Sequence, residues 1–178
     1  MTTLSLAIGL ASSYLAGPKP IEVQFARAVT GQNVTVMIDG RYTRSTFAGK
    51  LGFRDQNRTW LSLCADVRAP IASGQFFVVK PRFSSQVGGN AKLAGNIVAK
   101  YFKLAKTPDQ CAGLQIAVWE AMEDAGQHAD FASGRFRVRA TAAALDYGQD
   151  FYEAIYEARE AAFLESQNGD GQNQISTT

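Results

Sequence analysis

The stretch TPDQCAGLQIAVWEAMED, residues 107–124, carries the clearest helix signal of the chain. Thr107 belongs to the residue types that cap helix N-termini, and Pro108 is tolerated at the first helical position. Asp109 then places a negative charge in the first turn, where the helix dipole favours it. We therefore predict a helix that begins at Pro108 and runs to about Asp124.

Gln115 is the unusual residue of this predicted helix. It falls between two apolar stripes, one containing Cys111 and Trp119 and the other containing Leu114 and Val118. Its amide should therefore be at least partly buried, which costs about 1–3 kcal/mol unless its donors and acceptor are matched. Two interpretations follow: a core glutamine with satisfied hydrogen bonds, or an amide that has been consumed in a covalent bond.

The rest of the chain divides into a strand-rich part and a helix-rich part. Residues 20–88 contain short segments rich in β-branched and aromatic residues, separated by Gly, Asn, Asp or Pro. After them the pattern becomes helical, with predicted helices at 91–106, 108–124 and 140–167 and an extended link at 134–140. This order predicts an α+β fold: a β-sandwich or barrel-like subdomain (20–88) followed by a mainly α-helical subdomain (89–168).

Both ends leave alternatives open. In residues 1–19, Leu4, Leu6, Ile8 and Leu10 alternate with small or polar residues, and no Lys or Arg precedes them. This alternation favours an N-terminal strand over a signal peptide. Residues 169–178 form a polar, glycine- and asparagine-rich segment that is either a mobile tail or a last strand. No apolar run approaches the roughly 20 residues needed to cross a bilayer, so we expect no membrane span.

Composition excludes several function classes. The chain has 178 residues, 46% of them hydrophobic, which is typical of one folded domain. A net charge of +2, with bases scattered among acids, argues against a nucleic-acid partner. A single histidine argues against a histidine-based metal site and against a Ser-His triad. We expect neither a metal nor a cofactor.

The two cysteines, Cys64 and Cys111, allow several interpretations. Cys64 lies in TWLSLCADV (59–67), whose alternation places Trp60, Ser62 and Cys64 on one face. It could be a small buried hydrophobic residue, or it could form a disulfide with Cys111. As a hydrolase nucleophile it would need His128 as its base, and that histidine falls in a predicted loop after the helix, which argues against this interpretation.

LCAD (63–66), followed about fifty residues later by LQIAVWEAMED (114–124), resembles the internal Cys-Gln thioester domain of bacterial surface adhesins. The segments resemble more closely the thioester-forming exported proteins that often carry a PEP-CTERM sorting tail. FAGKLGF (47–53), LAGNIVAKYF (93–102) and FLESQNGDGQNQI (163–175) extend the resemblance over roughly residues 30–175. The chain departs from the adhesin pattern at Leu114, where Thr is usual, and at Leu63, where an aromatic is common. Cys111 is an additional thiol.

The resemblance implies a thioester between Cys64 and Gln115, with Asp66, Trp119, Glu120 and Leu114 in supporting positions. It implies covalent attachment to an amine-bearing protein or polyamine at a host or matrix surface, by single-turnover acyl transfer and not by turnover catalysis. The expected location is extracellular or at the cell surface, and the expected role is adhesion or matrix attachment. The alternative is a non-covalent extracellular surface-layer or matrix subunit with free thiols or a Cys64–Cys111 disulfide.

Overall fold

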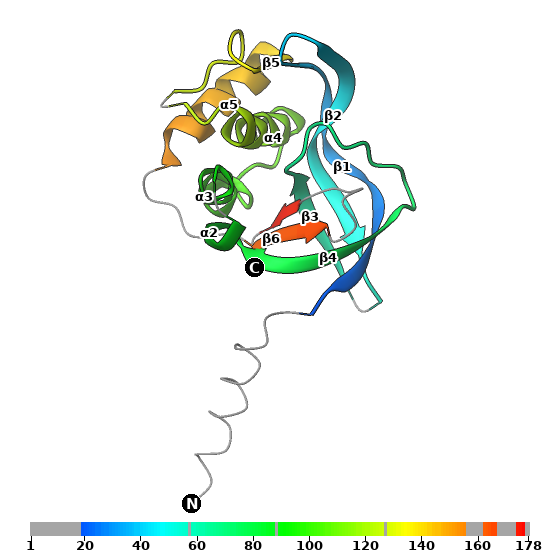
Figure 1. Ribbon diagram of the computed structural model, residues 1–178. Helices are drawn as coiled ribbons and strands as arrows, with labels where there is room; N and C mark the ends of the chain where they lie inside the picture. The colour runs from blue at the N-terminus through cyan, green and yellow to red at the C-terminus, as the bar shows by residue number, and fades with distance from the viewer. Residues whose placement is uncertain are drawn as a thin grey trace, which may run out of the picture.

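The computed structural model describes residues 19–56, 58–87, 89–126, 128–155, 162–166 and 174–176. In chain order the elements are β1 (Ile21–Ile38), β2 (Tyr42–Arg54), β3 (Thr59–Cys64), β4 (Phe76–Phe83), α2 (Ser84–Val87), α3 (Ala91–Tyr101), α4 (Pro108–Glu123), β5 (Phe136–Arg139), α5 (Ala142–Glu153), β6 (Ala162–Ser166) and β7 (Gln174–Ser176). Strands gather on one side and helices on the other, which confirms the predicted α+β class (Figure 1). The strand or signal peptide predicted at the N-terminus lies outside the described residues.

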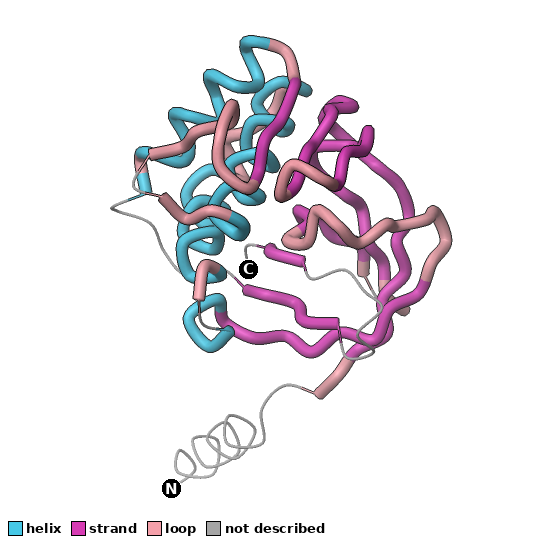
Figure 2. The backbone as a smooth tube through the Cα atoms, turned by 45° about the horizontal axis from the view of Figure 1, so that its top comes forward, coloured by secondary structure: helices cyan, strands magenta, loops and turns pink. Residues whose placement is uncertain are grey.

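The strands close into a barrel, one of the two architectures that the sequence predicted. β1 pairs with β2 along one edge and with β4 along the other. From β2 the ring continues through β3, β7 and β6 back to β4, and each of these pairs is antiparallel (Figure 2). β5 adds to the far end of β1. Each of these six strands therefore has a paired neighbour on both sides over part of its length.

The hairpin between β1 and β2 has a local cause in the sequence. Asp39 and Gly40 have φ values of 52° and 66°, the left-handed conformation that a two-residue type I′ turn requires. The turn is closed by Arg41 N–H, which donates to Ile38 O at 3.0 Å. Such a turn matches the twist of the two strands that it joins, so the long β1–β2 ribbon begins from a favourable connection.

α4 begins and ends where its capping residues predict. The Thr107 hydroxyl accepts a hydrogen bond from Gln110 N–H at 3.2 Å, and Gln110 Oε1 accepts one from Thr107 N–H at 3.1 Å. This reciprocal pair is a capping box. The helix lies between the barrel and its neighbours α3 and α5 (Figure 1). Close approach to α5 requires a glycine at position 113, because a Cβ on Gly113 would lie 2.7 Å from Ala144 O.

Two apolar cores meet at α4. The barrel core contains Cys64 together with Ile116 and Trp119 of α4. The helical core contains Cys111 and Leu114 of α4, packed with residues of α3 and α5. Residues 111–121 of α4 are all buried as a result. α4 thus packs against two apolar cores, but their membership differs from the predicted stripes: Cys111 lies with Leu114 and Val118 in the helical core, whereas Trp119 lies in the barrel core.

The third predicted helix is wrong in its second half. α5 ends at Glu153, and residues 162–166 form β6, which pairs with β4. β7 pairs with β6 and β3. It lies in residues 169–178, which were predicted to be either a mobile tail or a last strand. These strands occupy edges that would otherwise leave backbone N–H and C=O groups unpaired, and this long-range pairing overrides the local helical pattern. Within the described ranges, no helix combines the length and apolarity that crossing a bilayer requires.

Candidate functional site

The structure brings Cys64 and Gln115 together. Cys64 is the last residue of β3, and Gln115 lies midway along α4 with no exposed surface. The Gln115 amide donates from Nε2 to Cys64 O at 2.7 Å, and its Oε1 accepts from Cys64 N–H at 2.9 Å. The buried amide predicted from the helix pattern is therefore matched by both backbone groups of a single residue.

This double hydrogen bond also places the Gln115 amide against the backbone of the residue that carries the sulfur. The amide nitrogen and oxygen bind the two backbone groups of Cys64, so the amide carbon between them lies close to that residue's Cα. The Cys64 N–H donates to Oε1, the oxygen that would gain negative charge in an attack on this carbonyl, and a preorganised donor there would stabilise that charge.

The surroundings of Cys64 favour the protonated form of its side chain. The side chain is 7% exposed, and its Sγ–H donates to Asp66 O at 3.0 Å. Burial raises the pKa of the Cys64 thiol to about 12, against smaller lowering effects of the Asp66 backbone, the Trp119 indole and the Arg44 charge. A thiolate is therefore disfavoured at neutral pH, and the sulfur carries its proton.

A cavity of about 460 Å³ opens beside Cys64 and gives access from solvent. Its lining includes Asp66, which follows β3, and Trp119 of α4. Gln115 does not line this cavity, because its amide faces the Cys64 backbone. A small reagent in the cavity therefore meets the sulfur side of the Cys64–Gln115 pair.

Two predicted supporting residues, Asp66 and Trp119, lie at this cavity. Asp66 also has the turn role expected of an aspartate, because its Oδ1 accepts from Arg68 N–H at 2.9 Å. Trp119 is 2% exposed and packs against Phe136, with ring centroids 6.3 Å apart. Its indole N–H is buried and has no hydrogen-bond partner among the described residues, although it lies close enough to Cys64 to lower the pKa of the thiol.

The other two predicted supporting residues lie elsewhere. Leu114 is fully buried in the helical core. Glu120 is 2% exposed and accepts from Asp130 N–H at 3.1 Å, so it holds the loop that follows α4. Burial raises the pKa of Glu120 to about 7. Neither side chain lines the cavity at Cys64, because helical periodicity turns both away from the Gln115 amide.

The Cys64–Cys111 disulfide that the sequence left open is not formed. Neither cysteine is in a disulfide, and the two belong to the two different cores that meet at α4. Cys111 Sγ contacts Ala105 O at 3.6 Å. The same carbonyl accepts from the buried Lys50 Nζ at 2.7 Å, a contact that the sequence analysis missed. Cys111 is thus a core residue beside a buried lysine.

His128 lies away from Cys64. Its side chain is 80% exposed, and Nδ1 lies 3.6 Å from a carboxylate oxygen of Glu153 on α5. The cysteine–histidine pair that a hydrolase would need is therefore not assembled.

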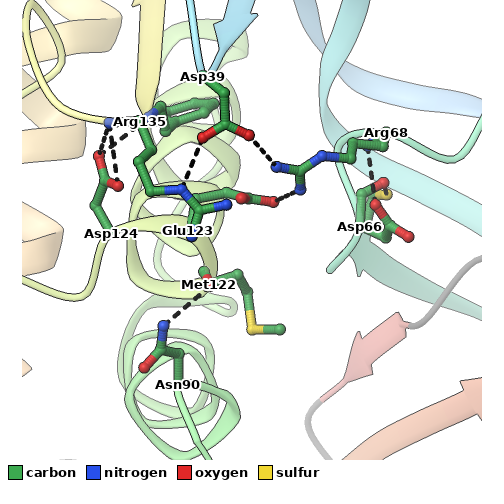
Figure 3. A network of polar contacts seen from close by, with 10 residues as sticks. Asp39, Asp66, Arg68, Asn90, Met122, Glu123, Asp124 and Arg135 are labelled. Atoms are coloured by element: carbon green, nitrogen blue, oxygen red, sulfur yellow. Dashed lines mark hydrogen bonds and ion pairs between the residues drawn. The ribbon is translucent and has the colours of Figure 1, made fainter. Parts of the chain in front are cut away.

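A polar network ties the segment after Cys64 to the helix that carries Gln115 (Figure 3). The Arg68 guanidinium binds Glu123, in the last turn of α4, and lies 3.5 Å from Asp39 in the β1–β2 turn. Arg135 Nε approaches the other Asp39 oxygen at 2.8 Å, and its backbone N–H donates to Asp124 at 2.9 Å. The Arg135 hydrogen bond is the largest effect that lowers the pKa of Asp39. Sequence reasoning missed this network because its members are distant in the chain.

Comparison with known proteins gives one structural similarity. No protein-family model matches the chain, and no curated protein sequence matches it. Among solved structures, it is similar to the N-terminal thioester domain of a surface protein from Clostridium perfringens. The two chains share a fold. The TM-score is 0.51 at 14% sequence identity, and the match covers 83% of this chain and 99% of the other. At this identity the similarity establishes the fold and does not establish a thioester between Cys64 and Gln115.

Proposed function

We propose that this chain is a bacterial surface thioester domain in which Cys64 and Gln115 form the reactive bond. The observation that carries the proposal is the double hydrogen bond between the Gln115 amide and the Cys64 backbone. It holds the acyl carbon and the sulfur-bearing residue together on two rigid elements, a strand end and a helix. The shared fold with a surface-protein thioester domain supports the same conclusion.

Bond formation is an acyl transfer that needs no oxidant. The Cys64 sulfur adds to the Gln115 carbonyl carbon, the carbon–nitrogen bond breaks, and the nitrogen leaves as ammonia after taking the thiol proton. The product is a thioester between β3 and α4. Its carbonyl is more reactive than an amide because sulfur donates electron density poorly and thiolate is a good leaving group.

The second step transfers the acyl group to a partner. A lysine amine attacks the Gln115 carbonyl, the Cys64 sulfur leaves as a thiol, and an isopeptide bond joins the two molecules. Each domain acts once, so the chain is not a turnover enzyme. The partner is an amine-bearing protein or polyamine on a host or matrix surface, and the role is adhesion at the cell exterior. An amide bond persists under load beyond the limit of non-covalent pairs.

The same two hydrogen bonds support a second candidate, a non-covalent surface or matrix subunit. A core glutamine that satisfies both backbone groups at a strand end is a sound structural element without further reaction. In that case the hydrogen bonds of Gln115 hold β3 against α4, and Cys64 and Cys111 both remain unreacted thiols.

Intact mass under denaturing, non-reducing conditions separates the two candidates. The thioester predicts a mass lower than the sequence mass by one ammonia, one titratable thiol, and an adduct after treatment with methylamine. Cys64→Ala and Gln115→Ala should abolish the mass loss and the adduct, whereas Cys111→Ala should retain both. A mass equal to that of the plain sequence, with no adduct, would overturn the thioester and leave the structural candidate.

A further inference from the structure

The cavity beside Cys64 has an uneven distribution of charge. Two arginines line it, Arg27 on β1 and Arg44 on β2, against one acidic residue, Asp66. Arg27 is exposed, whereas Arg44 is half-buried and donates to Arg68 O at 3.4 Å and to Thr46 Oγ1 at 3.3 Å. The Arg44 charge also lowers the pKa of the Cys64 thiol, so it acts at the sulfur itself.

The other walls of the cavity are suited to an aliphatic chain. They present apolar side chains from the barrel, the β3–β4 loop and α4: Phe25, Phe47, Leu51, Val67, Ile71 and Trp119. The methylene stem of a lysine can pack on such a surface while its amine stays at the polar end. The volume of about 460 Å³ is within the roughly 300–1,000 Å³ typical of ligand sites.

An amine reaches this cavity as an ammonium ion, and the two kinds of charge act on it in opposite directions. Asp66 attracts the ammonium group, and Arg27 and Arg44 repel it. A nucleophile that carries only a positive charge therefore gains little on entry. A nucleophile that also carries negative groups beside its amine can pair with Asp66 through its ammonium group and with the two arginines through its negative groups. This pairing raises the rate of productive encounter.

We propose that the cavity selects lysines in acidic peptide segments. The lysine amine lies at Asp66 and Cys64, and carboxylates of flanking residues pair with Arg27 and Arg44. Arginine suits this role because its planar fork of donors binds carboxylates in a bidentate manner. The inference rests on the proposed thioester function and specifies the partner that the same site takes.

Competition between peptides tests the selection directly. Three capped peptides of equal length would each carry one lysine, flanked by two glutamates, two alanines or two arginines. Adduct formation on the wild-type domain is followed by intact mass at low and high salt. The expected order of rates is Glu, then Ala, then Arg, with the Glu-flanked peptide about fivefold or more ahead of the Ala-flanked one at low salt. High salt should compress the differences.

Matched variants assign the effect to the two arginines. Arg27→Gln and Arg44→Gln should each reduce the ratio of the Glu-flanked rate to the Ala-flanked rate, and Arg44→Lys should retain more of it than Arg44→Gln. The control is Arg54→Gln, on β2 outside the cavity, whose guanidinium donates to Gln24 at 2.6 Å and whose loss should leave the ratio unchanged.

The outcomes separate this inference from the function on which it rests. Absence of a methylamine adduct on the wild-type domain would overturn the thioester itself. A methylamine adduct together with equal rates for the three peptides would overturn only the acidic selection. Faster capture of a sulfated amino sugar than of every peptide would show that the arginines select anionic sugars, and would overturn the peptide assignment.

Discussion

The side-chain amide of Gln115 hydrogen-bonds both backbone groups of Cys64, donating to the carbonyl at 2.7 Å and accepting from the N–H at 2.9 Å. The pair joins the end of β3 to the middle of α4 inside the molecule, where Gln115 has no exposed surface. The pair therefore has two roles that can be measured apart: its hydrogen bonds contribute to folding, and its residues are those of the acyl transfer that we propose.

The contribution of the hydrogen bonds should appear once the covalent bond is removed. In a Cys64→Ala background no thioester can form, and Gln115→Ala then removes the two hydrogen bonds from the glutamine amide to the N–H and C=O of residue 64. Loss of a partner of a buried polar group costs about 1–3 kcal/mol, so we expect the two losses to lower the free energy of unfolding by about 2–6 kcal/mol. Urea denaturation of the single and double variants measures it. Gln149→Ala in the same background removes a helical glutamine of α5 and should cost less than about 1 kcal/mol; an equal cost at position 115 would contradict the structural role.

Asp66 should accelerate amine capture through its charge. Asp66→Asn keeps the oxygen that accepts from Arg68 N–H, so we expect the free energy of unfolding to change by less than about 1 kcal/mol. It removes the carboxylate that attracts an incoming ammonium ion, so the rate of methylamine adduct formation should fall by about three- to tenfold. Asp146→Asn, an exposed substitution on α5, serves as the control. An unchanged rate in Asp66→Asn would show that the carboxylate has only its turn role.

Features that depend on residues close together in the chain, such as a helix start or a tight turn, could be predicted from the sequence. The start of α4 follows from Thr107, Pro108 and the capping box, which lie within four residues of one another. The burial of Gln115 follows from helical periodicity, although its partner could be named only through the motif around Cys64. The Asp39-Gly40 pair is a local hairpin signal as well, although no turn was predicted from it.

Features that depend on distant partners could not be predicted in this way. Residues 162–166 carry a helix-like apolar pattern, but their conformation is decided by pairing with β4 and β7 when the barrel closes. The ion pair between Arg68 and Glu123 joins residues whose separation in the chain gives no signal. Lys50 stands among apolar residues of a strand, and only the fold shows that two carbonyls near the end of α3 receive its ammonium group.

Lys50 should be required for stability although it lies outside the thioester site. It is 6% exposed, and its Nζ donates to Phe102 O at 2.6 Å and to Ala105 O at 2.7 Å. A cation at this position satisfies carbonyls that follow the last turn of α3 and favours the negative end of its dipole. Lys50→Met leaves both carbonyls without that donor, and we expect a loss of about 2–4 kcal/mol in chemical denaturation. Lys103→Met, an exposed substitution, should change stability by less than about 0.5 kcal/mol.

Glu120 should make the stability of the domain depend on pH. Burial, with Asp124 and Asp130 nearby, raises the pKa of this carboxyl from 4.5 to about 7, although the hydrogen bond from Asp130 N–H opposes the shift. Tyr152 faces the same region, and one Glu120 oxygen is buried without a partner among the described residues. Between these two pH values the unfolded chain loses its proton while the folded domain keeps it. The associated stability is therefore fully present below about pH 4.5 and is lost as the pH rises to about 7, at most about 3 kcal/mol.

Glu120→Gln isolates this contribution because an amide does not ionise. The stability of the variant relative to the wild type should rise between about pH 4.5 and 7, and should change little outside that window. Urea denaturation across the pH range measures the difference, and the carboxyl carbon resonance of Glu120 in the wild type should titrate near neutral pH. A constant difference between the two proteins from pH 4 to pH 8 would show that Glu120 ionises equally in the folded and unfolded states. The loop held at Asp130 would then not depend on protonation of this residue.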